Sequence, residues 1–132
     1  MEYPHKDLTE KIIGCFYTVY NVLGYGFLEK VYERALLIEL RKAGLAASSQ
    51  VPIKVKYEGE IVGDYFADII VEEKVILEIK SAEALMEEHE NQLINYIRAT
   101  DVEVGLLLNF GKQPFIRRKV FANDRKHPNT SV

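Results

Sequence analysis

Two short apolar runs in the middle of the chain carry charged residues where buried strands tolerate few. The runs Phe66–Val71 and Val75–Leu77 are rich in Ile and Val and are joined by a short charged turn, a pattern typical of strands buried on both faces. Asp68 interrupts the first run, and Glu78 and Lys80 follow in the second. Residues two apart on a strand project from the same face, so Glu78 and Lys80 point the same way. Asp68 lies beside them if the two strands pair.

Such a group of charges needs a physical reason, because a charge in an apolar strand is costly unless it is paired or binds a metal. One interpretation is a divalent-cation site, in which Asp68 and Glu78 supply oxygen ligands and Lys80 meets an anionic substrate. The other is a buried Glu–Lys pair, or strand ends that already reach solvent. Asp64 competes for the acidic role, but Asp68 lies deeper in apolar sequence.

The periodicity of the apolar residues predicts the other elements. Apolar residues at helical spacing indicate helices, and alternating ones indicate strands. Three successive strands with short turns form an antiparallel meander, and a strand that follows the next helix lies parallel to the strand before it through a right-handed crossover. We expect helices over 7–23, 28–43 and 85–100, and strands over 51–57, 60–71, 75–81, 104–110 and 115–121. The expected apolar stripe of the second helix is Leu28, Val31, Tyr32, Ala35, Leu36 and Leu40.

The length of 132 residues suits one domain with its own core. We place that domain at residues 1–122 and expect the polar segment 123–132, which contains Pro128, to be disordered. No apolar run approaches the roughly 18 residues of a membrane-spanning helix. The N-terminal stretch also lacks the apolar core of a signal peptide. These features predict a cytoplasmic protein that does not enter a membrane.

The net charge of −3 does not favour strong non-specific binding to nucleic acid. It leaves a nuclease open, because charge can be unevenly distributed. The segment 113–127 is rich in Arg and Lys, and it is either a phosphate-contacting patch or a solvated strand and terminus. The single cysteine, Cys15, lies on the apolar side of a helical pattern and is expected in the core.

Asp68 followed by Glu78, Ile79 and Lys80 looks like the core of the PD-(D/E)XK nuclease superfamily. Ala67 stands where the name-giving proline of the superfamily would be, but that proline is not a metal ligand. The resemblance extends over about residues 8–120 and so covers nearly the whole chain.

Three further stretches agree with this resemblance. The stretch GFLEKVY, which holds Gly26, Glu29 and Tyr32, is similar to the motif that names the GxxExxY family of small proteins, a family placed in that superfamily. The helical stretch QLINY at 92–96 and the strand GLLLNFG at 105–111 occur in the expected order.

The resemblance implies an α/β fold with a mixed sheet of the α+β kind. It would have the restriction-endonuclease-like αβββαβ core, preceded by one extra N-terminal helix. The resemblance further implies that Asp68, Glu78 and the backbone carbonyl of Ile79 bind Mg²⁺ or Mn²⁺.

For catalysis, the resemblance implies that Lys80 positions the attacking water or stabilises charge on phosphorus, while Glu29 and Gln92 assist from neighbouring helices. The implied partner is nucleic acid, DNA or RNA, and a homodimer is one way for a fold of this size to hold a duplex. Glu29 has a second interpretation, as an acid in the first turn of a helix that complements the helix dipole.

His89, Gln92 and Tyr96 share one face of the third predicted helix. His89 is a candidate proton-transfer group, and each of the three is otherwise a half-buried polar residue bonded to the backbone. Two alternatives to a nuclease stay open: a nucleic-acid-binding module without turnover, and a protein-interaction domain whose charged group is an ion-pair network. The intact Asp68, Glu78 and Lys80 favour the nuclease.

Overall fold

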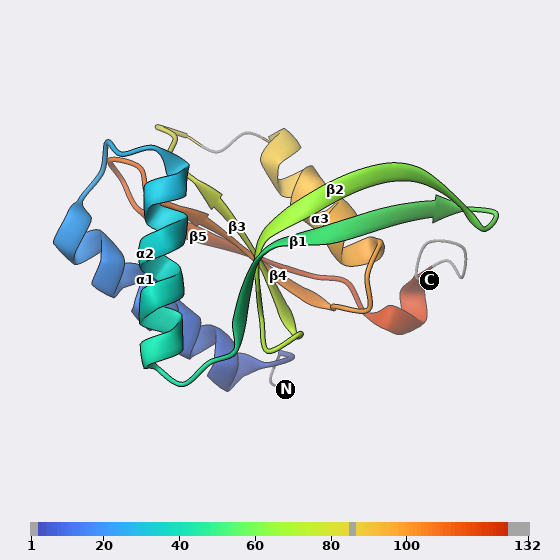
Figure 1. Ribbon diagram of the computed structural model, residues 1–132, viewed down its shortest axis with the longest axis horizontal. Coiled ribbons are helices and arrows are strands. Elements are labelled where there is room, and N and C mark those ends of the chain that lie inside the picture. Colours follow the sequence, from blue (N-terminus) through green and yellow to red (C-terminus); the bar gives the residue numbers. More distant parts are fainter. Residues whose placement is uncertain (1–2, 85–86, 127–132) are drawn as a thin grey trace.

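A mixed sheet of five strands forms the middle layer of the molecule, and helices cover both of its faces (Figure 1). The computed structural model describes residues 3–84 and 87–126. Leu85 and Met86, expected at the start of the third helix, lie outside the described residues. The helices are α1 (Lys6–Leu23), α2 (Glu29–Lys42) and α3 (Glu87–Arg98), and the strands are β1 (Ala47–Tyr57), β2 (Glu60–Val71), β3 (Val75–Lys80), β4 (Val104–Asn109) and β5 (Phe115–Val120).

The strands lie in the order β1-β2-β3-β4-β5. Strands β1, β2 and β3 pair antiparallel as a meander, β3 pairs parallel with β4, and β4 pairs antiparallel with β5. The chain passes from β3 to β4 through α3, which confirms the expected helical crossover. The element order, α1 and α2 followed by three strands, α3 and β4, is the predicted αβββαβ order of a mixed α/β fold with one additional leading helix.

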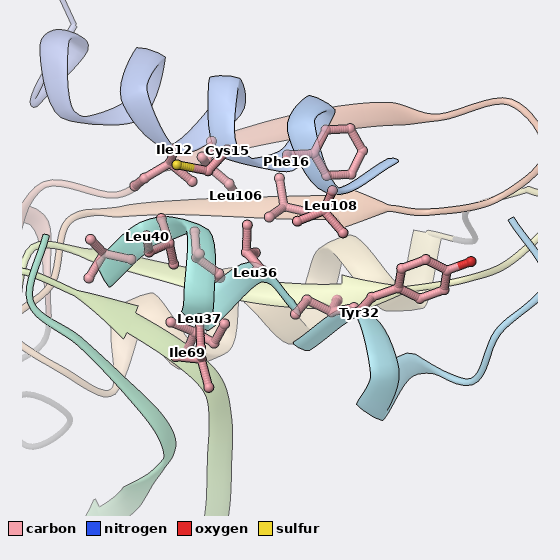
Figure 2. Close-up of a cluster of buried hydrophobic side chains, with 14 of the residues drawn as sticks. Ile12, Cys15, Phe16, Tyr32, Leu36, Leu37, Leu40, Ile69, Leu106 and Leu108 are labelled. Atoms are coloured by element: carbon pink, nitrogen blue, oxygen red, sulfur yellow. The ribbon is translucent and has the colours of Figure 1, made fainter. Parts of the chain in front are cut away.

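The larger core lies between the sheet and the pair α1 and α2 (Figure 2). On α1 the buried residues Ile12, Cys15, Phe16 and Val19 recur at positions i, i+3, i+4 and i+7, which places them on one helical face. Cys15 is therefore a core residue, as expected, and burial raises the pKa of its thiol. Leu36 of α2 is fully buried in the same core, so truncation to alanine there costs about 2–5 kcal/mol.

The buried face of α2 differs from the expected stripe. Leu28 is 80% exposed and Val31 is 39% exposed, so both predictions of burial are wrong. The residues that face the core are instead Tyr32, Glu33, Leu36, Leu37 and Leu40. These positions are also spaced for one helical face, but the set includes a glutamate. The inward direction of that acid matters for the site described below.

The β1–β2 hairpin extends well past the rest of the sheet, and Figure 1 shows it curving alongside α3. Strand β2 pairs with β1 along nearly its whole length, but it pairs with β3 only over Ile69–Val71. The distal part of the hairpin is supported from one side by α3, because Ile53 and Ala67 belong to the core cluster that contains Leu93 and Ile97. Two strands alone are marginally stable in water, so these contacts with α3 help to stabilise the arm.

Part of the C-terminal segment that was expected to be disordered has regular structure. Residues Asn123–Arg125 form a 3₁₀ turn, and Lys126 donates hydrogen bonds of 2.8 Å and 2.7 Å to the carbonyls of Thr100 and Val102. Residues 127–132 lie outside the described residues. Within the described ranges, no helix is both long and apolar enough to cross a bilayer.

Candidate active site

Two carboxylates meet where β2 and β3 separate. Regular pairing between these strands ends at Ile69 and Leu77. Just beyond it, Glu78 Oε2 accepts a 2.9 Å hydrogen bond from the backbone N–H of Asp68. In return, Asp68 Oδ2 accepts a 2.8 Å bond from the backbone N–H of Ile79. Because the strands diverge here, these two backbone amides bond to side-chain carboxylates and not across a β2–β3 ladder. The two bonds hold both carboxylates in one place.

The acidic pair is electrostatically strained. Glu78 is only 4% exposed, and its pKa is raised from 4.5 to about 8 because burial disfavours the ionised form and the charge of Asp68 lies close by. The charge of Lys80 acts in the opposite direction and does not offset these two effects. A divalent cation would supply the missing positive charge, and carboxylate oxygens are the ligands that Mg²⁺ and Mn²⁺ prefer. The donor set therefore fits such an ion.

Within residues 3–84 and 87–126, no group of three or more His, Cys, Asp or Glu side chains is arranged to hold a metal ion. The set expected from the sequence has two carboxylates and one backbone carbonyl. This set matches the usual coordination of Mg²⁺, which is commonly bound by one or two carboxylates and keeps water and substrate phosphate as its other ligands.

Lys80 lies at the end of β3, beside Asn109 of β4, and is partly buried. In the part of the chain that the structure describes, its ammonium makes no ion pair and no side-chain hydrogen bond. The carboxylates of Asp68 and Glu78 bond to backbone amides instead. The arrangement is therefore not the directly bonded Glu–Lys pair considered from the sequence. Asp64, the competing acid, is well exposed and pairs with Lys54 over 2.8 Å, so it takes no part in this group.

The segment after Lys80 is fastened to the end of β4. Asn109 is fully buried, its Oδ1 accepts a bond from the N–H of Ala82, and its Nδ2 donates to the carbonyl of Ala82, both at 2.9 Å. Gly111 lies so close to Ala82 that a side-chain carbon there would collide with the Ala82 carbonyl oxygen. Asn109 and Gly111, both from the strand motif, thus fix the position of Ala82, two residues after the candidate catalytic residue Lys80.

Glu29, the acid of the helical motif, is exposed at the start of α2. Its Oε2 accepts a 3.2 Å bond from the backbone N–H of Ser81, directly after Lys80. Glu29 therefore lies close to the end of β3, and its described hydrogen bond is to the loop that follows this strand.

The acid that enters the site from α2 is Glu33, which the sequence analysis did not assign. Glu33 is 6% exposed, and its charge contributes to the raised pKa of Glu78. Gln50 Nε2 donates a 3.0 Å hydrogen bond to Glu33 Oε1, and Lys30 Nζ lies 3.6 Å from Glu33 Oε2. A signal was available, because Glu33, Leu36, Leu37 and Leu40 are spaced as one inward helical face.

Gln50 stands opposite Asp68, since the pairs on either side, Ser49–Ile69 and Val51–Ala67, keep one register. Its backbone φ is 52°, in the left-handed region. A residue other than glycine adopts this conformation at a cost of about 1–3 kcal/mol, and such positions cluster at functional sites. The strained residue lies on the strand next to the acidic pair and holds Glu33.

Tyr32, the last residue of the helical motif, is structural. Its ring is fully buried and stacks on Phe110 with 4.4 Å between centroids and an angle of 13°. Its hydroxyl donates a 2.7 Å bond to the carbonyl of Gly24 and accepts a 3.2 Å bond from the N–H of Phe27. The motif tyrosine thus fastens the connection between α1 and α2 to the core.

Gln92 and Tyr96 line a pocket between α3 and the β1–β2 hairpin, which His89 also lines. Gln92 Nε2 donates a 2.9 Å bond to the hydroxyl of Tyr96 and makes no described bond to the carboxylates. Burial raises the pKa of Tyr96, and the nearby charge of Glu78 raises it further. Tyr96 therefore lines the pocket and also lies near the acidic pair.

The basic residues near the C-terminus contact groups of the chain itself. Arg118 donates a 2.7 Å bond to Thr9 Oγ1 and lies over the ring of Tyr3. Lys119 pairs with Glu90. Arg117 lies over the ring of Phe115, and Arg125 lies over the ring of Phe121. Lys126 donates hydrogen bonds to the carbonyls of Thr100 and Val102.

Comparison with known proteins gives one family and one fold. The family profile described as the PD-(D/E)XK nuclease superfamily matches residues 6–120. No curated protein matches the chain. Among solved structures, the crystal structure of SSO0001 is similar, with a TM-score of 0.54 and 18% identity over 70% of this chain and 50% of that one. This chain spans about half the length of that structure, and at this identity the likeness shows the fold alone.

Proposed function

The chain belongs to the PD-(D/E)XK nuclease superfamily, and on this premise we propose that it hydrolyses phosphodiester bonds in DNA or RNA with the help of a divalent metal ion. The observation that carries the proposal is the reciprocal bonding of Asp68 and Glu78 at the point where β2 and β3 separate, with Lys80 on the same strand end. We also assign the chain to the GxxExxY family, on Gly26, Glu29 and Tyr32.

In this proposal, Asp68, Glu78 and the carbonyl of Ile79 hold Mg²⁺ or Mn²⁺. A divalent ion held there would lower the pKa of a bound water and polarise the phosphodiester. The ammonium of Lys80 would orient the attacking water or stabilise the negative charge that develops on the phosphate. Its lack of a described ion-pair partner supports this role, because the charge is not already neutralised by a neighbour.

The residues around this group have supporting roles in the proposal. Glu33, held by Gln50, adds negative charge beside Glu78 and favours cation binding. Glu29 bonds to the loop after Lys80 and keeps that strand end in position. Gln92 acts through Tyr96, to which it is bonded.

The test is a cleavage assay with single-stranded and double-stranded DNA and RNA in the presence of Mn²⁺, comparing the wild-type chain with Lys80→Ala. We expect the wild type to cut at least one substrate and Lys80→Ala to cut none while still binding Mn²⁺. If the wild type binds nucleic acid and Mn²⁺ but cuts nothing, the chain is a silent binding module and the proposal fails. We propose a homodimer only if the chain cleaves duplexes. Light scattering with the duplex present measures the mass of the complex and so tests this part of the proposal.

A further inference from the structure

A pocket of about 650 Å³ opens between α3 and the distal part of the β1–β2 hairpin. Its size falls in the range of about 300–1,000 Å³ that is usual for small-molecule sites. The hairpin curves past α3 on this side of the molecule (Figure 1). The lining includes Val55, Tyr65, Asn91, Gln92, Asn95 and Tyr96. Since Tyr96 lies close enough to Glu78 to feel its charge, the pocket is a neighbour of the acidic group.

Aromatic rings form two of the pocket walls. Tyr65 is 46% exposed, and its ring centroid lies 5.7 Å from that of Tyr96 at an angle of 45°. The two rings are tilted, so they do not stack on each other. The ring of Tyr65 packs over Gly63, where a side-chain carbon would lie only 2.9 Å from Tyr65 Cε2. A residue with a side chain at position 63 would therefore displace the ring.

The third part of the lining is a row of amides. Asn91 and Asn95 lie one turn apart on α3, and both are exposed. Neither side chain makes a hydrogen bond to another described residue, so their donors and acceptors are open to a ligand. The charged lining residues do not favour binding of an anion. Glu88 is negative, and Arg98 Cζ lies 5.4 Å from the ring centroid of Phe121, so its guanidinium already contacts a ring.

We propose that this pocket takes one unstacked nucleobase of a single-stranded nucleic acid, with its ring against Tyr65 and its edge hydrogen-bonded to Asn91 and Asn95. The inference rests on the proposed function and names its substrate class as a single strand. Binding of the nucleic-acid backbone relies largely on Lys and Arg, and the pocket lining contains one such residue, Arg98. Neutral amides beside an exposed tyrosine suit instead a planar group that carries both donors and acceptors. An unpaired base of a single strand offers both its face and its edge in this way, whereas a base that is paired and stacked in a duplex offers neither.

The test measures binding, with Ca²⁺ in place of Mg²⁺ to slow cleavage. The probe is a short single-stranded DNA with a central 2-aminopurine, whose fluorescence falls when it stacks. A second probe has the same backbone with abasic sites throughout. The variants are Tyr65→Ala, Tyr65→Phe and the double variant Asn91→Ala with Asn95→Ala. Tyr57→Ala is the matched control, because Tyr57 is an exposed tyrosine of the same hairpin that does not line the pocket.

We expect Tyr65→Ala to weaken binding of the base-containing strand by about tenfold or more and to abolish the fluorescence change. Tyr65→Phe and Tyr57→Ala should keep both, and the double asparagine variant should weaken binding of the same strand. The abasic strand should bind weakly to all variants alike. Equal binding of the two strands, or equal effects of Tyr65→Ala and Tyr57→Ala, would overturn the inference.

The two proposals fail in distinguishable ways. A base-dependent fluorescence change without any cleavage in Mn²⁺ leaves the pocket assigned and sinks the nuclease. Cleavage by the wild type that is unaffected by Tyr65→Ala, together with equal binding of the abasic strand, sinks the pocket alone.

Discussion

Gln50 donates a 3.0 Å hydrogen bond to the buried carboxylate of Glu33, and this bond ties β1 to α2 beside the acidic group. Gln50 lies between Ser49 and Val51, whose partners on β2 flank Asp68, and the charge of Glu33 raises the pKa of Glu78. One side-chain contact thus connects a strained strand position to the electrostatics of the pair that we assign to metal binding.

Glu33→Gln should reduce cleavage more than Glu29→Gln. The glutamine keeps an acceptor for Gln50 but removes the charge beside Glu78. Residues that support a metal site in this way typically contribute about 10- to 100-fold to metal affinity or activity. Glu29→Gln keeps an acceptor for the Ser81 N–H and serves as the matched control. Apparent Mn²⁺ affinity and initial cleavage rates measure both effects, and equal losses in the two variants would remove the special role of Glu33.

Lys80→Ala should leave the free energy of unfolding within about 0.5 kcal/mol of the wild type, because the described structure gives its ammonium no ion-pair partner. If Lys80 were the partner of a buried carboxylate, its removal would cost about 3–5 kcal/mol. Urea unfolding of the two proteins in chelator separates the outcomes, and a loss of the larger size would restore the ion-pair interpretation.

The metal-free chain should lose stability as the pH rises between 4.5, the ordinary pKa of a glutamate, and about 8, the pKa of Glu78 in the folded chain. In this window the folded chain holds a proton that the unfolded chain has released, so the free energy of unfolding falls with increasing pH. The stabilisation is complete below the lower value and is lost as the pH passes the higher one, with a total on the order of a few kcal/mol.

Glu78→Gln is the control for this pH effect, because it keeps an acceptor for the Asp68 N–H but cannot ionise. Urea midpoints across the pH range should fall for the wild type and stay flatter for the variant. Parallel curves for the two proteins would show that Glu78 does not carry the effect.

Tyr32→Phe should lower the free energy of unfolding by about 1 kcal/mol, since it removes the hydrogen bond to the Gly24 carbonyl but keeps the ring on Phe110. Metal affinity should not change. Tyr57→Phe, at a 62% exposed tyrosine, should stay within about 0.5 kcal/mol of the wild type. A Tyr32→Phe variant of full stability that binds Mn²⁺ more weakly would assign this tyrosine to the site instead.

Much of the fold could be predicted from periodicity, because the apolar spacing of α1 and the alternation of β1 are local properties. The antiparallel pairing of β1, β2 and β3 followed from their short turns, and the parallel direction of β4 followed from the helix between it and β3. The buried face of α2 was phased wrongly at its N-terminal end, where Leu28 and Val31 are exposed. Hydrophobicity alone does not mark a glutamate as buried, and the signal for Glu33 was its helical spacing with Leu36, Leu37 and Leu40.

Part of the candidate site could also be predicted from the sequence. The proximity of Asp68 and Glu78 could be predicted, since the two lie near a turn between adjacent strands. Their bonds to each other's neighbouring backbone amides could not, because these bonds depend on where β2 and β3 separate. The role of Gln50 also depends on a positive φ at a residue other than glycine, which no sequence pattern marks.

The central claim is that Asp68 and Glu78 form a metal site, and calorimetric titration with Mn²⁺ tests it most directly. The wild type and Asp68→Asn should be compared with and without a short single-stranded oligonucleotide. We predict binding by the wild type, tighter with the oligonucleotide because phosphate completes the ligand set, and loss of binding in Asp68→Asn with the fold unchanged by circular dichroism. Equal Mn²⁺ affinity in the two proteins, or no binding by the wild type even with oligonucleotide present, would contradict the account.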